Sequence, residues 1–258
     1  MDHVIVDRPD FKMNKKRAYI LGPEEKIPRQ QLPDNVKVGE FLEVVVAEVA
    51  SPERFWIQLK GKDTNKALVW LMEEIKQFYG KSFQDYRVNN EDLLSAGLAC
   101  VNLHSDGYWY RAVVTSFQDL TTVEVFFIDY GNVFQVKKSS LAYLCRRFDK
   151  LPGQAFEARL DGIKPARGRR DFTKEATQRF LQLTDVFTDN TEYLGLVAVI
   201  RGLGETLSLS LIDTCTNNLP QGIVINQVLV DEGLAVPYED SEKHVMDKAN
   251  SWLDQQSA

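Results

Sequence analysis

The stretch from His104 to Asn132 decides the fold, and it reads H-S-D-G-Y-W-Y-R-A-V-V-T-S-F-Q-D-L-T-T-V-E-V-F-F-I-D-Y-G-N. Two runs rich in aromatic and β-branched residues flank a polar segment, 118–122. This pattern predicts a hairpin of two strands joined by a turn. The second run ends in D-Y-G-N, where Gly131 can take a positive φ and turn the chain sharply.

Three aromatic side chains of this stretch, Tyr110, Phe127 and Tyr130, are expected to gather at one end of a small barrel. Aromatic faces around an open position are the usual way to bind a bulky, weakly hydrated cation. The alternative is that these rings are ordinary barrel core, because Phe127 has an equally apolar neighbour in Phe126. Alternation along the strands predicts that Trp109 and Phe126 belong to the core.

The composition allows a sizeable core and disfavours several functions. Hydrophobic residues make up 44% of the 258 residues, enough for one large domain or two small ones. The formal net charge of −6 disfavours general nucleic-acid binding and favours a basic partner. The N-terminus lacks the apolar core of a signal peptide, and no run approaches the ~20 apolar residues of a membrane span. We therefore expect a cytoplasmic protein with no membrane association.

Cysteine and histidine are too few and too scattered for a disulfide framework or a metal centre. No CxxC pair occurs, and the odd number of cysteines favours buried thiols in a reducing compartment. No histidine pair has metal-like spacing, so we expect no metal and no cofactor. The residues concerned are Cys100, Cys145, Cys215, His3, His104 and His244.

Upstream of the hairpin, the pattern predicts a strand pair followed by a helix. Phe41 to Ala50 alternates like a strand, S-P-E makes a turn, and Arg54 to Leu59 returns. Apolar residues at helical spacing predict a helix from Asn65 to Tyr79, and Gly80 is placed to end it. The first strand pair is too small to bury a core alone, so we expect it to pair with later strands.

Around and after the hairpin, short strands alternate with helices. We expect strands at 98–103, 109–117, 123–128, 133–136, 156–160, 194–200 and 206–212, a helical turn at 138–144, and helices at 172–183 and 223–232. Short antiparallel strands with tight turns suit a small barrel. The loop 162–170 carries four basic residues that could contact RNA phosphates, the alternative being a solvated loop.

Several segments together resemble the extended Tudor domain of germline proteins that bind PIWI proteins in the small-RNA pathway. They are S-P-E-R-F-W-I-Q-L (51–59), D-G-Y-W-Y-R-A (106–112), F-I-D-Y-G-N (127–132), L-P-G-Q-A-F (151–156) and V-L-V-D-E-G-L-A (228–235). The resemblance covers about residues 38 to 236, and the order and spacing of the segments make it specific.

The resemblance implies a mainly β fold with flanking helices (α+β), in which a five-stranded Tudor barrel is inserted into a split β-barrel similar to staphylococcal nuclease (OB-type), joined by a helix. We accordingly expect an N-terminal tail or clasp at 1–37 and the first part of the split domain with its linker helix at 38–95. The Tudor barrel would follow at 96–148, the second part of the split domain at 149–236, and a polar segment at 237–258.

The resemblance also implies a function without catalysis, namely binding of Arg-Gly or Arg-Ala motifs that carry symmetric dimethylarginine. The family holds this group with four aromatic residues and an asparagine. Tyr110, Phe127 and Tyr130 match three of the aromatic positions, and Asn132 matches the asparagine. The fourth aromatic position is occupied by His104, whose neutral imidazole can stack on a guanidinium but whose protonated form would repel it.

The ligand would be a peptide of a PIWI- or Argonaute-type protein in cytoplasmic, perinuclear germ granules, with no direct RNA binding. Arg111 and Asp129 are candidates for an ion pair that supports the cage, the alternative being surface charges without structural consequence. A scaffold of the same fold that binds unmethylated arginine or another protein surface is the runner-up function. A nuclease is disfavoured, because Lys164 stands near the position where such enzymes have a calcium-binding aspartate, and lysine cannot ligate calcium.

Overall fold

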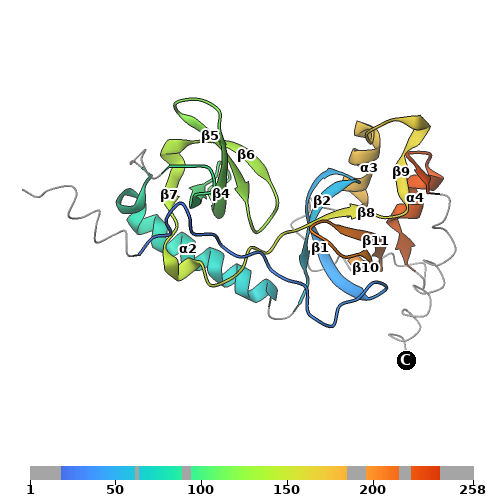
Figure 1. Ribbon diagram of the computed structural model, residues 1–258, viewed down its shortest axis with the longest axis horizontal. Coiled ribbons are helices and arrows are strands. Elements are labelled where there is room, and N and C mark those ends of the chain that lie inside the picture. Colours follow the sequence, from blue (N-terminus) through green and yellow to red (C-terminus); the bar gives the residue numbers. More distant parts are fainter. Residues whose placement is uncertain (1–18, 62–63, 89–93, 185–195, 215–221, 239–258) are drawn as a thin grey trace, which may run out of the picture. The chain divides into compact units, whose positions relative to one another are not determined.

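The computed structural model describes residues 19–61, 64–88, 94–184, 196–214 and 222–238. Contacts divide the chain into two compact units (Figure 1). The first unit comprises Met1–Gln30 and Lys66–Gln154, and the second comprises Gln31–Asn65 and Ala155–Ala258. The second unit is thus built from two pieces of chain, with most of the first unit lying between them in sequence.

A curved, five-stranded antiparallel sheet with the strand order β6-β5-β4-β3-β7 forms the main part of the first unit (Figure 1). Its strands are β3 (Ala99–Leu103), β4 (Trp109–Phe117), β5 (Thr122–Phe127), β6 (Val133–Lys137) and β7 (Leu141–Tyr143). The expected hairpin is confirmed, because β4 and β5 pair in register from Ala112↔Phe127 to Phe117↔Val123. The expected helical turn at 138–144 is only partly present. The 3-10 turn η2 covers Lys138–Ser140, and β7 then pairs with β3.

Helix α2 (Thr64–Tyr86) packs against this sheet and is longer than expected. The prediction that Gly80 ends the helix is wrong. A glycine inside a helix costs about 1 kcal/mol relative to alanine, but the next two turns bring Phe83 and Tyr86 against the buried core. Burial of these rings offsets the cost, so tertiary packing extends the helix past the glycine.

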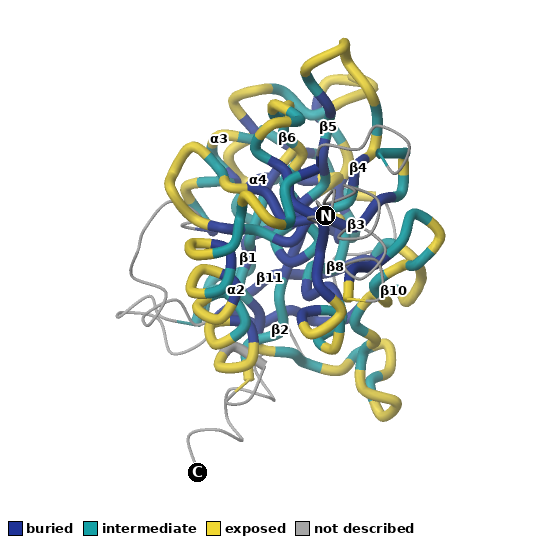
Figure 2. Tube along the Cα trace, turned by 90° about the vertical axis from the view of Figure 1, so that its left-hand side faces the viewer, coloured by how far each residue is buried: buried dark blue, intermediate teal, exposed yellow. Residues whose placement is uncertain are grey.

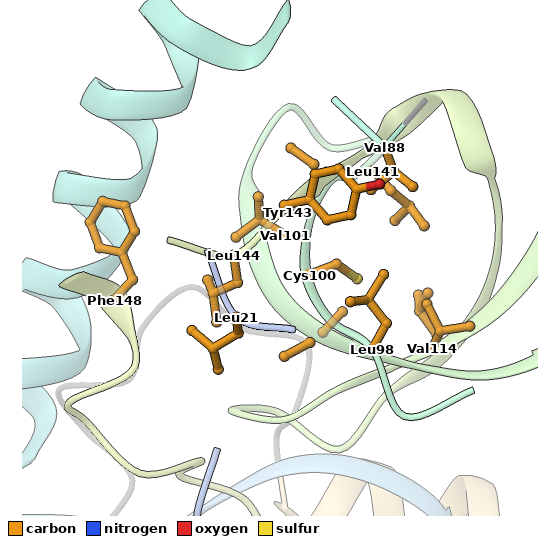
Figure 3. Close-up of a cluster of buried hydrophobic side chains, with 14 of the residues drawn as sticks. Leu21, Val88, Leu98, Cys100, Val101, Val114, Leu141, Tyr143, Leu144 and Phe148 are labelled. Atoms are coloured by element: carbon orange, nitrogen blue, oxygen red, sulfur yellow. The ribbon is translucent and has the colours of Figure 1, made fainter. Parts of the chain in front are cut away.

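Buried side chains of the sheet, of α2 and of an N-terminal segment form one core in the first unit. Figure 3 shows part of this core, including Leu21 of the N-terminal segment and side chains of β3 and β7. Leu21 belongs to this core, and its backbone N–H donates to the carbonyl of Leu144 at 2.9 Å. Two further backbone hydrogen bonds join Gly153 to Pro28 and Gln30. The described residues 20–30 therefore run beside 144–153. The 3-10 turn η3 (Arg146–Phe148) lies in this second stretch.

Strands of the second unit close on themselves. The order β10-β1-β2-β8-β11-β12 is completed by an additional β10–β11 pairing, so five of the strands form a barrel. These strands are β1 (Phe41–Ser51), β2 (Arg54–Leu59), β8 (Phe156–Leu160), β10 (Leu196–Gly202), β11 (Leu207–Asp213) and β12 (Ile223–Val224). The β1–β10 pairs confirm that the first strand pair is completed by later strands. Figure 2 shows buried positions along the strands and exposed positions in the loops.

Two helices and a short strand pair complete the second unit. Helix α3 (Lys174–Thr184) packs against β1, and α4 (Ile225–Asp231) packs against β11. The expected loop at 162–170 instead contains β9 (Ile163–Pro165), paired with β13 (Ala235–Pro237), and the 3-10 turn η4 (Ala166–Gly168). The helix expected at 223–232 begins two residues later, because Ile223 and Val224 pair with β11.

Candidate functional site

Four aromatic rings gather at one end of the five-stranded sheet. His104 follows β3, Tyr110 lies in β4, Phe127 ends β5, and Tyr130 lies in the turn after β5. The rings of Tyr110 and Phe127 are stacked, with their centroids 4.8 Å apart and their planes at 9°. The structure therefore brings together every aromatic residue that was predicted from the sequence for this site.

Two of these rings stand almost perpendicular to the stack. The plane of His104 makes angles of 85° with Tyr110 and 88° with Phe127, at centroid distances of 6.0 and 5.5 Å. Tyr130 makes an angle of 82° with Tyr110, at 5.3 Å. Tyr110 and Phe127 thus form a layered base, and His104 and Tyr130 form walls beside it.

The turn after β5 positions Tyr130 and Asn132. Gly131 has φ +93°, a conformation that side chains other than glycine rarely adopt. The N–H of Gly131 donates to the carbonyl of Phe127 at 2.8 Å, and the N–H of Phe127 donates to the carbonyl of Asn132 at 2.9 Å. These bonds fold the D-Y-G-N segment back towards β5. Asn132 is half-buried next to the aromatic turn.

Acidic groups lie close to the two tyrosines. The Tyr110 hydroxyl donates to Oδ2 of Asp106 at 2.8 Å, and Asp106 also accepts from the N–H of Tyr108 at 2.9 Å. Burial, followed by the hydrogen bond to Asp106, raises the pKa of Tyr110. Burial, followed by the charges of Asp129 and Asp106, raises the pKa of Tyr130 to about 12. Both phenols are therefore neutral at physiological pH, and the negative charge beside them lies on carboxylates.

Arg111 and Asp129 form a buried, two-pronged ion pair behind the aromatic cluster. Nε of Arg111 donates to Oδ2 of Asp129 at 2.9 Å, and Nη2 donates to Oδ1 at 2.6 Å. The side chains are 0% and 1% exposed. The alternative of surface charges without structural consequence is therefore wrong. Sequence reasoning could not choose between these alternatives, because arginine and aspartate are rarely fully buried.

The remaining donors of this guanidinium bind backbone carbonyls. Nη1 donates to Phe148 at 3.0 Å and to Leu151 at 2.6 Å, and Nη2 donates to Pro152 at 3.1 Å. All five N–H groups of the arginine thus have acceptors. The segment is also joined to Asp129, whose Oδ1 accepts from the N–H of Gln154 at 3.2 Å. The ion pair therefore ties the strand that carries Tyr110 to the segment 148–154.

The expected division between core and site residues was partly wrong. Trp109 is buried as predicted, but Phe126 is half-buried, whereas Phe127 is 2% exposed. Phe127 therefore belongs to the hydrophobic core and to the aromatic cluster at once. Sequence reasoning also missed Phe134 in β6, whose ring lies 4.5 Å from His104. The sequence feature that could have identified Phe134 is its position two residues after Asn132, in a strand whose side chains alternate between the two faces of the sheet.

Other residues singled out in the sequence take no part in this cluster. Cys100 and Cys145 are buried free thiols, as predicted, whereas Cys215, His3 and His244 lie outside the described residues. In the described ranges, no three His, Cys, Asp or Glu side chains gather as a metal site. The same ranges contain no helix long and apolar enough to cross a membrane. Arg167, Arg169 and Arg170 of the basic loop are exposed in the second unit.

A curved five-stranded sheet with an aromatic cluster at one end, carried by a chain that also forms a split β-barrel, defines the extended Tudor class of fold. The Tudor domain family model matches residues 36–162. The extended Tudor domain TD3 of mouse TDRD1, in complex with a MILI peptide containing dimethylarginine 45, has a TM-score of 0.70 and 26% identity, covering 83% of this chain and 100% of that chain. The BmPAPI extended Tudor domain in complex with sDMA has a TM-score of 0.66 and 28% identity, covering 77% and 99%. Residues 36–162 are therefore a Tudor domain, and the chain has the extended Tudor fold.

Curated relatives point to the same family. Tudor domain-containing protein 5 of Rattus norvegicus is 31% identical over 202 residues, which cover 77% of this chain and 19% of that protein. Tudor domain-containing 6 of Danio rerio is 38% identical over 152 residues, which cover 57% of this chain and 7% of that protein. The chain thus spans about a fifth or less of the length of these relatives.

Proposed function

We propose that this chain is a non-catalytic reader of methylated arginine. Its ligand would be symmetrically dimethylated arginine in an Arg-Gly or Arg-Ala motif of a PIWI- or Argonaute-type protein. The observation that carries the proposal is the grouping of His104, Tyr110, Phe127 and Tyr130, with two walls perpendicular to a stacked base.

The chemistry of methylarginine suits this arrangement. Methylation keeps the positive charge of the guanidinium, removes N–H donors and adds apolar surface. Two rings stacked at 4.8 Å leave no room for a third planar group between them. The open position must therefore lie beside the stack, on the side of the half-buried Tyr110, because Phe127 is buried. There His104 and Tyr130 would offer their faces, while Asn132 would accept a remaining N–H.

Electrostatics support a cationic ligand. The carboxylate of Asp106 accepts from the Tyr110 hydroxyl at 2.8 Å and places negative charge beside the cluster, whereas the charge of Asp129 is balanced by the buried guanidinium of Arg111. The charge of Asp106 attracts a cation, and a cation over an aromatic face gains about 0.5–2 kcal/mol depending on desolvation. Two structural neighbours at 26% and 28% identity were solved with dimethylarginine ligands, which supports the same ligand class here.

The second candidate function is a scaffold that binds unmethylated arginine, and His104 is the observation that favours it. Imidazole is smaller and more polar than the phenyl or phenol ring expected at this position. The two candidates make opposite predictions for one peptide prepared with and without the methyl groups. In either case we propose a scaffolding role in the piRNA pathway, in cytoplasmic germ granules.

The test is calorimetric titration of the whole chain with one Arg-Gly-repeat peptide, symmetrically dimethylated or unmodified. We expect the dimethylated peptide to bind more tightly. Tyr130→Ala and Asn132→Ala should each weaken its binding by about tenfold or more, while circular dichroism stays unchanged. Phe117→Ala is the matched control, since this exposed aromatic residue lies in the same sheet, at the opposite end of β4 from Tyr110. Unchanged affinity in both site variants, or calcium-dependent hydrolysis of nucleic acid by the chain, would refute the proposal.

A further inference from the structure

A fifth ring packs against the aromatic cluster. Phe134 lies in β6 and contacts two cluster members, His104 at a centroid distance of 4.5 Å and Phe127 at 5.3 Å. The first distance is the shortest between rings of this cluster. The planes of Phe134 and His104 meet at 47°, an arrangement between stacked and perpendicular.

Strand pairing explains why Phe134 points towards the cluster. Phe134 pairs with Val125 of β5, and directly paired residues present their side chains on the same side of a sheet. Val125 and Phe127 are both buried on this side. Phe134 is half-buried, whereas its neighbours Val133 and Gln135 are exposed. The alternation of β6 therefore directs this one aromatic side chain of the strand to the side that carries the base of the cluster.

His104 depends on neighbouring rings for its orientation. Within the described ranges, its imidazole nitrogens make no hydrogen bond to the protein, and its backbone bonds to Tyr108 and Gly107 fix only the turn. The ring planes of Tyr110 and Phe127 meet it edge to face. Phe134 is the closest ring, at 4.5 Å, and it meets the imidazole at an intermediate angle of 47°, so removing it would leave space into which the imidazole could turn.

We propose that Phe134 and His104 together form the fourth wall of the cage, with Phe134 as the residue that preserves its preference for methylated arginine. The phenyl ring packs on His104 at 4.5 Å and on Phe127 at 5.3 Å, and through these contacts it holds the imidazole in its perpendicular orientation beside the stack. Methyl groups gain from apolar contact, whereas an unmodified guanidinium gains mainly from charge and hydrogen bonds. The inference rests on the proposed function and names the residue that determines its specificity.

The test compares both forms of the Arg-Gly-repeat peptide with wild type and Phe134→Ala. We expect Phe134→Ala to weaken binding of the dimethylated peptide by about 3- to 10-fold, the cost of a lost aromatic contact of this kind. Binding of the unmodified peptide should change less than about twofold, so the ratio of the two affinities falls. A residue with a merely structural role would change both affinities by the same factor. Phe117→Ala should leave the ratio unchanged.

Two further variants keep the test decisive. Phe134→Leu retains most of the packing volume without the aromatic face, and it replaces the alanine variant should that variant fail to fold. His104→Phe restores an apolar ring at the fourth position, so loss of the Phe134 ring should matter less in that background. Equal weakening of both peptides, or none, overturns the inference while leaving the proposed function intact. A wild-type chain that binds neither peptide refutes the proposed function and this inference with it.

Discussion

The buried ion pair offers the sharpest test of how this Tudor domain is held together. Asp129→Asn keeps the shape of the side chain but removes its charge, and it replaces one acceptor oxygen with an NH2 group. The guanidinium of Arg111, which is 0% exposed, would then retain its charge without a counter-ion. One of its two bonds to residue 129 would become a contact between two donors. The three backbone carbonyls bound by Arg111 cannot compensate for the missing negative charge.

The expected cost follows from the class of interaction. Removing one partner of a buried ion pair destabilises a protein by about 3–5 kcal/mol, because the other charge stays buried and unpaired. Total stabilities of natural domains are about 5–15 kcal/mol, so this single oxygen-to-NH2 change should bring the first unit close to unfolding. Replacing both partners, as in Arg111→Met with Asp129→Leu, should cost less than the single change, although it leaves the carbonyls of 148, 151 and 152 unpaired.

The assay must report on the first unit alone, because a chain with two compact units need not unfold in one step. Hydrogen exchange of peptides that cover β4 and β5 provides this resolution. We expect a large loss of protection in Asp129→Asn, with β1 and β10 of the second unit unaffected. Glu232→Gln is the control, since it neutralises the partly exposed Arg179–Glu232 pair and should have little effect. A loss below about 1 kcal/mol for Asp129→Asn would refute the reasoning.

Two other substitutions follow from single positions in the first unit. Gly80→Ala should raise the thermal stability, by about 0.5–1 kcal/mol, because Gly80 is inside α2 and an added Cβ would meet no atom within 4 Å; a lower melting temperature would contradict this. Glu25→Gln should lower stability at neutral pH but not in acid. The hydrogen bond from Arg146 lowers the pKa of Glu25 below its ordinary 4.5, so the carboxylate stabilises the folded chain above pH 4.5 and this contribution is lost as the pH falls through the lowered pKa. The melting temperatures of wild type and Glu25→Gln should therefore differ at pH 7 and converge in acid. An equal difference in melting temperature at both pH values would show that the ion pair is not the cause of the destabilisation.

Much of the fold could be predicted from alternation and turn residues. The strand at 109–117 has the predicted bounds because aromatic and β-branched residues continue to both ends of it. Strand β7 was mistaken for a helical turn. All three of its residues are buried, so its sequence shows no alternation of apolar and polar residues that would predict a strand. The end of α2 was misplaced because the local signal of Gly80 is weaker than the burial of two aromatic rings in the following turns.

The candidate site was predictable where one motif carried it. The segments around Tyr110 and D-Y-G-N predicted the site residues that lie within them. The turn at Gly131 then brings Tyr130 next to Tyr110. Phe134 was missed because its role depends on the partner strand, which alternation in β6 alone does not identify. Burial of the Arg111–Asp129 pair depends on the carbonyls of a segment about 40 residues further along the chain. No local pattern specifies such contacts.

The split second unit has a consequence for the order in which the protein can form during its synthesis. Strand β1 pairs with β10, whose first residue, Leu196, is made about 150 residues after Phe41. The larger part of the first unit, Lys66–Gln154, is made in the meantime, so this unit is complete and can fold before β10 is made, because domains generally fold as units during translation. Strand β8 can pair with β2 before then, but until β10 emerges the other edge of β1 has no partner strand. Slow, late closure of this barrel should therefore limit the yield of the folded chain.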